Sequence, residues 1–93
     1  MITMVVLIGN SDNKLTQSEW AHYVEAMRLV IERACYIVHF FGGSSTYAPW
    51  QNVCWTIEIS IANVDILKFD ITNIRRSYKQ DSVAVMTGVT EFI

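Results

Sequence analysis

Apolar and polar positions recur with two different periods along this chain, and each change of period marks an expected element. Residues 2–8 form an apolar run rich in β-branched side chains that ends at Gly9-Asn10, as is typical of a strand. Because both faces of this run are apolar, we expect a central strand that is covered on two sides. A polar turn over residues 10–14 follows it.

The next segment is predicted to be a helix, and it carries the clearest start signal in the sequence. Thr16 and Glu19 have the T-x-x-E spacing of a capping box, and Leu15 and Trp20 are placed to form a hydrophobic staple across it. Apolar residues then recur at three- and four-residue spacing, as a core-facing helical stripe requires. This stripe comprises Trp20, Tyr23, Val24, Met27, Val30, Ile31 and Ala34.

Two strands are expected next, at residues 35–41 and 52–61, and the loop between them begins at Gly42-Gly43. The second strand has the cleanest alternation in the sequence. Its apolar positions are Val53, Trp55, Ile57, Ile59 and Ile61, and its polar positions are Asn52, Cys54, Thr56, Glu58 and Ser60. One face of this strand therefore packs on the core, while the other meets solvent or a polar site.

A second helix is predicted over residues 63–79. Its buried stripe comprises Val64, Leu67, Ile71, Ile74 and Tyr78. Residues 67–72 also alternate as a strand would, but we favour the helix because the 3.6-residue period extends further along the chain. In a helix, Ile66 and Phe69 would lie on the far face near Arg76, where apolar side chains need a cover.

A last strand is expected at residues 82–86, and residues 89–93 continue it or return along it after a glycine. Residues 1–93 then form a single α+β domain with the order β-α-β-β-α-β. This order matches the ferredoxin-like split βαβ plan, an antiparallel sheet with two helices on one face. The other face of such a sheet is open, and it is a common place to dimerise or to bind a ligand.

Composition adds an expectation of self-association. Hydrophobic residues make up 52% of the 93 residues and charged residues 17%, which is more apolar surface than one small core can hide. Excess apolar surface on a small domain usually indicates a homo-oligomer or a protein partner. The net charge of −2 argues against nucleic-acid binding driven by electrostatics, which needs clustered lysine and arginine.

The apolar runs are shorter than the ~20 residues that span a bilayer, and residues 1–3 lack the positive charge of a signal peptide. We therefore expect a cytoplasmic protein that does not contact a membrane. Its two cysteines form no dense framework, so we expect free thiols in a reducing compartment.

The reactive side chains do not form a recognisable catalytic set. Cys35, Cys54 and His39 fall on strands that are expected to be neighbours, so a thiol–imidazole pair is geometrically open. We favour buried thiols and a structural histidine instead. The histidines and cysteines match no zinc spacing, and the sequence 42–45 leads into a strand where a phosphate loop would lead into a helix. We expect neither a metal nor a cofactor.

The aromatic loop before the third strand is the best candidate for contact, because proline beside tryptophan offers a rigid apolar surface. The alternative is that this loop folds back and caps the core. The candidate partner- or ligand-binding residues are Tyr47, Trp50, Gln51 and Asn52, together with Ile66, Phe69 and Arg76 of the second helix.

Three segments of the chain resemble small uncharacterised proteins of actinobacteria and their phages. They are residues 9–20, 48–55 and 80–85, with the sequences GNSDNKLTQSEW, APWQNVCW and QDSVAV. The resemblance implies a bacterial or phage accessory protein, and it transfers no functional residue to this chain.

These observations predict a small non-enzymatic interaction protein that self-associates and binds a protein partner, such as a host protein with which a phage product interferes. One alternative is a binding module for a small or nucleotide-like ligand, on which Trp50 would stack. A second alternative is a small enzyme that uses a Cys–His pair.

Overall fold

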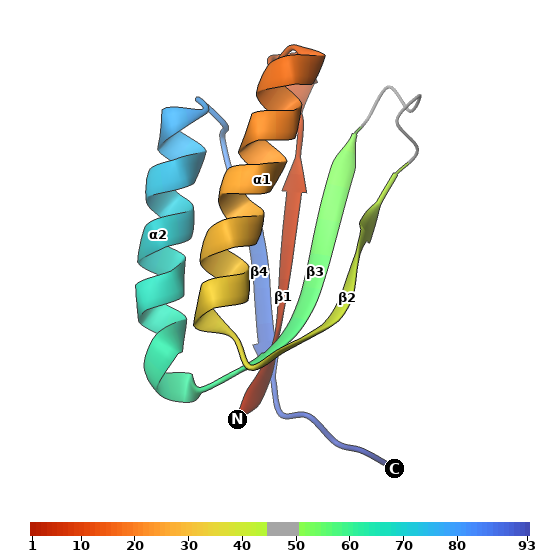
Figure 1. Cartoon of the computed structure of the whole chain (residues 1–93), viewed down its shortest axis with the longest axis vertical. Helices are drawn as coiled ribbons and strands as arrows, with labels where there is room; N and C mark the ends of the chain where they lie inside the picture. The colour runs from red at the N-terminus through yellow and green to blue at the C-terminus, as the bar shows by residue number, and fades with distance from the viewer. Residues whose placement is uncertain (45–50) are drawn as a thin grey trace.

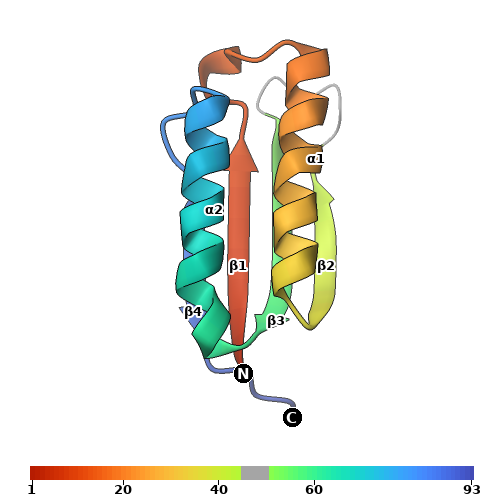
Figure 2. The same cartoon turned by 60° about the vertical axis from the view of Figure 1, so that its left-hand side comes forward.

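Four strands form an antiparallel sheet in the order β2-β3-β1-β4, and two α-helices pack against one face of it (Figure 1, Figure 2). The computed structural model describes residues 1–44 and 51–93. Its elements are β1 (Ile2–Gly9), α1 (Gln17–Ala34), β2 (Ile37–Gly43), β3 (Asn52–Ile59), α2 (Val64–Ser77) and β4 (Ala84–Gly88), with 3-10 turns at Ser11–Asn13 and Ile61–Asn63. The predicted α+β, ferredoxin-like order is confirmed.

Helix α1 begins at the predicted capping box. The Thr16 hydroxyl accepts a hydrogen bond from the Glu19 amide at 3.2 Å, and the Glu19 carboxylate accepts one from the Thr16 amide at 2.9 Å. These bonds satisfy amides that have no partner within the helix. Cys35, in an extended conformation, ends the helix. The buried residues of the predicted stripe are Trp20, Tyr23, Met27 and Ile31.

Segment 64–77 is helical throughout, so the strand alternative for residues 67–72 is wrong. The helix prevails because its longer period buries one continuous stripe, as the sequence predicted. Val64, Leu67 and Ile71 are buried, and Ile74 and Tyr78 pack against the core.

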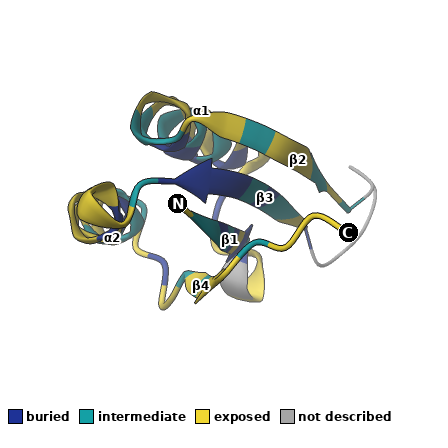
Figure 3. Ribbon diagram, turned by 90° about the horizontal axis from the view of Figure 1, so that it is seen from below, coloured by how far each residue is buried: buried dark blue, intermediate teal, exposed yellow. Residues whose placement is uncertain are grey.

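The core lies between the two helices and the inner face of the sheet (Figure 3). The two central strands supply its sheet side, with Met4, Val6 and Ile8 from β1 and Trp55, Ile57 and Ile59 from β3. Trp55 is fully buried, as the alternation of the third strand predicted. The tryptophan therefore serves the stability of the fold.

The end of β3 differs from the prediction. The strand stops at Ile59, and Ile61, which alternation placed in the core, is 75% exposed in the following 3-10 turn. The Ser60 hydroxyl accepts a hydrogen bond from the Ala62 amide at 3.3 Å. This local bond starts the turn in competition with the strand.

Two other strands are shifted. β2 begins at Ile37, two residues later than predicted, because Cys35 still closes α1. β4 covers Ala84–Gly88, and residues 89–93 do not continue it as a strand. Within a single protomer, the expectation that β1 is covered on two sides is also wrong. Both helices lie on one face, so the side chains of alternate β1 residues point to the face without helices.

Candidate functional site

The face of the sheet opposite the helices is the first candidate. The strand register assigns its outward positions as Thr3, Val5 and Leu7 of β1, Ile37 and Phe40 of β2, Asn52, Cys54, Thr56 and Glu58 of β3, and Ala84 and Met86 of β4. His39, in the irregular part of β2, joins them through its contact with Glu58. Leu7, Ile37, Phe40 and Met86 are exposed large apolar side chains. We call this surface the open face. The open face is largely apolar, whereas the solvent-exposed face of an antiparallel sheet normally carries polar residues.

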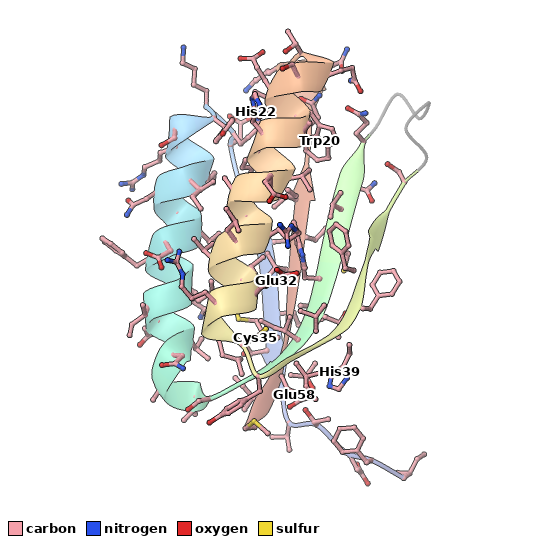
Figure 4. The ribbon with its side chains drawn as sticks, in the orientation of Figure 1. Trp20, His22, Glu32, Cys35, His39 and Glu58 are labelled. Atoms are coloured by element: carbon pink, nitrogen blue, oxygen red, sulfur yellow. The ribbon has the colours of Figure 1, made fainter. Side chains whose placement is uncertain are left out.

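One carboxylate is buried on the open face. Glu58 is only 4% exposed, and its Oε1 accepts hydrogen bonds from the hydroxyls of Thr3, at 2.7 Å, and Thr90. His39 Nε2 lies 3.4 Å from the same oxygen, and Figure 4 shows the imidazole and the carboxylate side by side. A β-bulge between Val38 and Phe40 brings His39 to this position.

These contacts act on the proton affinity of Glu58. The hydroxyl of Thr90, then that of Thr3, holds the pKa of this carboxyl below its ordinary value, because a donated hydrogen bond favours the charged form. Burial opposes the shift, and His39 adds to it. Glu58 is therefore a carboxylate at neutral pH.

The segment after β4 is tied to the open face through this carboxylate. Thr90 bonds to Glu58 and also contacts the hydroxyl of Thr3. Two residues on, the ring of Phe92 meets the His39 imidazole edge to face, with 6.2 Å between centroids. The segment thus passes from β4 across the ends of β1 and β3 towards β2 (Figure 3).

The structure gives His39 a carboxylate as its partner. The Cys35 thiol, at the end of α1, donates instead to the Glu32 carbonyl at 3.8 Å, and burial raises its pKa. Cys54 is a free thiol opposite Leu7 in the register. Among the interactions of residues 1–44 and 51–93, neither thiol is bonded to His39. The Cys–His enzyme stays a hypothesis without a contact that supports it.

Those same residues contain no group of three or more histidine, cysteine, aspartate or glutamate side chains arranged to hold a metal ion. In the described part of the chain, neither helix is long and apolar enough to cross a bilayer.

The aromatic loop lies partly outside the described residues, and this includes Tyr47 and Trp50. Gln51 is buried and exchanges two hydrogen bonds with the side chain of Gln17, at 2.9 and 3.0 Å. Its amide oxygen also accepts a bond from Asn10 at 3.4 Å. Asn52 is exposed at the start of β3, and its amide donates to the Ser44 hydroxyl at 2.9 Å. A binding role for these residues stays a prediction.

A pocket of about 500 Å³ lies beside this region, between α1 and the ends of β2 and β3. Gln51 and Asn52 contribute to its rim. Figure 4 shows Trp20 projecting from α1 on the side of these strands. The sequence predicted contact residues here but not a cavity, because a cavity depends on which part of a strand a helix leaves uncovered.

The outer face of α2 carries the remaining predicted residues. Ile66 and Phe69 are 61% and 65% exposed, and Arg76 is exposed on the same helix. They are on the far side of the helix from its buried stripe, as the periodicity predicted. Whether a partner covers them stays a prediction.

The cluster around Glu58 was missed by sequence reasoning. Alternation placed Glu58 on the polar face of its strand, but the partners come from Thr3, 55 positions earlier, and from Thr90, 32 positions later. The one signal in the sequence that pointed to this cluster is a glutamate between two isoleucines of a strand, because charged side chains are seldom found in such apolar surroundings.

Comparisons with known proteins support the fold alone. No family model matches the sequence, and no curated protein matches it. Among solved structures, a dimeric ferredoxin-like protein of unknown function from Thermobifida fusca aligns with a TM-score of 0.65 and 7% sequence identity. The alignment includes 97% of this chain and 92% of that protein's chain. The chain has the ferredoxin-like fold.

Two enzymes also match in structure. A hydroxynitrile lyase from Passiflora edulis is 8% identical in sequence and aligns with a TM-score of 0.64. The alignment includes 97% of this chain and 94% of the lyase chain. A phage SAM lyase in its apo state is 14% identical, with coverage of 99% and 91% and a TM-score of 0.46. At these identities a shared fold says nothing of activity. The neighbours include one actinobacterial and one phage protein, but no similarity of sequence supports a common origin.

Proposed function

We propose that the protein is a small, non-enzymatic interaction protein that acts as a homodimer, with two copies pairing through their open faces. The apolar side chains of the open face carry this proposal. Leu7, Phe40 and Met86 are exposed there, because neither helix covers this face of the sheet. Pairing with the same face of a second copy would remove them from water, at roughly 25 cal/mol for each Å² of apolar surface.

The size of the open face suits a dimer interface. A strand of eight residues is about 26 Å long, and four strands about 4.8 Å apart are roughly 19 Å wide. The face therefore has a plan area on the order of 500 Å², and the relief of its side chains enlarges the accessible area. Val89 and Phe92 of the segment after β4 add exposed apolar surface at its edge. A standard interface buries about 800 Å² of accessible surface on each partner. The open face and the segment at its edge together can supply an area of this order.

The charge of the open face also suits pairing of identical copies. A two-fold interface brings each patch against itself, so like charges would repel. Glu58 is the one acidic residue among the outward strand positions given above, and those positions include no lysine or arginine. In the segment after β4, Glu91 is exposed beside Thr3, Val5 and Met86, so one further negative charge lies at the edge of the face. The Glu58 carboxylate is buried under Thr3, Thr90 and His39, so it does not present its charge to a second copy.

A dimeric protein with the same fold supports this proposal, because it shows that such a fold can pair. The protein partner that we propose beyond the dimer is a host protein in a bacterial or phage setting. This setting is the one that the sequence led us to expect, and the observation that supports a partner is the exposure of apolar side chains on α2. Ile66, Phe69 and Arg76 would face that partner, because they lie on α2, away from the open face.

A dilution series followed by ¹H–¹⁵N correlation spectra tests the dimer and its location together. If the open faces pair, dilution shifts the amide signals of Val5, Leu7 and Met86 and leaves those of Ile66 and Phe69 unchanged. Sedimentation velocity over the same series gives the dissociation constant. A monomer at every concentration would refute the proposal, and so would a dimer whose dilution shifts fall on α2.

A further inference from the structure

The pocket beside α1 has apolar walls that the core holds in place. Trp20 and Val24 of α1 form one wall, and Phe41 of β2 and Val53 of β3 form the other. The Phe41 ring packs on the buried Trp55 ring, with 5.3 Å between centroids, which fixes the position of the second wall. Pockets of this size that are already formed and mostly apolar are typical of small-molecule sites.

On the strand side of the pocket, position 43 is a glycine, which has no side chain to fill the cavity. A side chain at Gly43 is excluded, because its Cβ would lie 2.0 Å from the carbonyl oxygen of Asn52. The close approach of β2 and β3 therefore requires glycine at this point, and no side chain from position 43 narrows the pocket.

The charged residues on the pocket wall are already paired. Arg28 Nε donates to a Glu25 carboxylate oxygen at 2.8 Å, and its Nη1 donates to Glu32 at 2.6 Å. A second terminal nitrogen of Arg28 bonds to the other Glu25 oxygen. One cation is thus shared by two carboxylates, which leaves the group with a net charge of about −1 at neutral pH.

An anionic ligand would find no favourable charge here. Among the described lining residues, Arg28 is the one cation, and Glu25 is beside it. The polar rim is also occupied, since Gln51 bonds to Gln17 and Ser44 bonds to the backbone of β3. A phosphate group would have to break these bonds or remain unpaired, and both cost free energy.

We infer that this pocket binds a small, uncharged and largely apolar molecule and does not bind a nucleotide. The inference is independent of the proposed dimer, because the pocket walls on α1, Phe41 and Val53 are on the helix side of the sheet and the open face is on the other side. Asn52, at the start of β3, is the one residue named for both surfaces. It also changes the second hypothesis from the sequence. A small ligand fits the pocket, but a nucleotide-like one does not.

Two fluorescent probes with the same ring system test the class of ligand. N-phenyl-1-naphthylamine is uncharged, and 1-anilinonaphthalene-8-sulfonate adds one negative charge. We expect the uncharged probe to bind about threefold more tightly or better, as repulsion by one partly exposed charge would give. Tighter binding of the sulfonate, or binding of AMP at similar concentration, would overturn the assignment.

A matched pair of variants tests the place of binding. Ala21 is exposed on α1 and lines the pocket, so Ala21→Phe fills it without touching the core. His22 is exposed on the same helix but is not among the lining residues, so His22→Phe adds the same phenyl group elsewhere. We expect Ala21→Phe to weaken binding of the uncharged probe about tenfold or more by excluded volume, and His22→Phe to change it less than twofold.

Equal affinities of the two variants would show that the probe binds elsewhere, and would refute the inference. Amide shifts of the wild-type protein at Val24, Phe41 and Val53 on addition of probe give a second test that needs no variant. The same titration on a protein with Leu7→Glu in the open face separates this inference from the dimer. Probe binding should persist in that variant even where the dimer is lost.

Discussion

Replacement of Leu7 by glutamate is the sharpest test of the proposed dimer. Leu7 lies on the central strand β1, with Cys54 of β3 and Ala84 of β4 as its cross-strand neighbours. It is 41% exposed on the open face, so a pairing copy would cover it near the centre of the interface. Because the side chain is outside the core, the substitution leaves the inner packing of the protomer intact.

The expected effect follows from burial and charge. Full burial of a leucine stabilises by about 1.5–3 kcal/mol. The exposed part of Leu7 therefore contributes about 1 kcal/mol per copy when a partner covers it. A glutamate there would also lose hydration, at a further cost of about 1 kcal/mol or more per copy. With two copies in the interface, the loss is about 4 kcal/mol, which raises the dissociation constant roughly 1,000-fold.

Sedimentation velocity across a dilution series measures this change, and Leu29→Glu is the matched control. Leu29 is 52% exposed on α1, so the control makes the same chemical change at a similar exposure on the other side of the molecule. The reasoning fails if Leu7→Glu dimerises like the wild type, or if both variants dissociate equally. Circular dichroism of dilute samples checks that both protomers are folded.

Three further predictions concern stability and are measured by denaturation. Thr16→Ala removes the hydroxyl of the capping box and should lower the free energy of unfolding by about 1 kcal/mol; an unchanged urea midpoint would contradict the cap. Glu58 has a pKa below its ordinary value of 4.5, so its contribution is complete above that pH and is lost as the pH falls through the lower folded value. Between about pH 6 and pH 3, the melting temperature of Glu58→Gln should therefore fall less than that of the wild type, and parallel curves would refute this. The Tyr23 hydroxyl is buried and has no hydrogen-bond partner among residues 1–44 and 51–93, and burial raises the pKa of Tyr23 to about 12. Tyr23→Phe should leave the free energy of unfolding unchanged or raise it by up to about 1 kcal/mol, whereas a loss of that size would reveal a partner.

Local periodicity was sufficient to predict the elements of this fold. The capping box at Thr16 and the stripe of α1 depend on neighbours within four residues, so the sequence shows them directly. The alternation of β3 likewise placed Trp55 in the core. Ile61 was misplaced because the Ser60 hydroxyl accepts a hydrogen bond from the Ala62 amide, and this bond ends the strand before the alternation of apolar residues ends.

The candidate sites depend on contacts that no local pattern encodes. Glu58 becomes a buried hydrogen-bond acceptor only because the register sets Thr3 opposite it and because Thr90 crosses the same strands. The pocket beside α1 exists because α1 leaves part of β2 and β3 uncovered. Both depend on how distant elements are placed, which a single sequence does not contain. The predicted contacts on α2 required only helical periodicity, and their exposure was predicted correctly.

The position of β1 in the sheet has a consequence for synthesis of the protein. β1 is central, but every strand that pairs with it is far downstream, since Gly9 pairs with Asn52 and Leu7 with Ala84. A chain that grows from its N-terminus therefore presents this apolar strand unpaired until at least 43 more residues have followed. Such distant pairing slows folding and leaves hydrophobic segments accessible meanwhile. We expect the nascent chain to depend on chaperones more than its small size suggests.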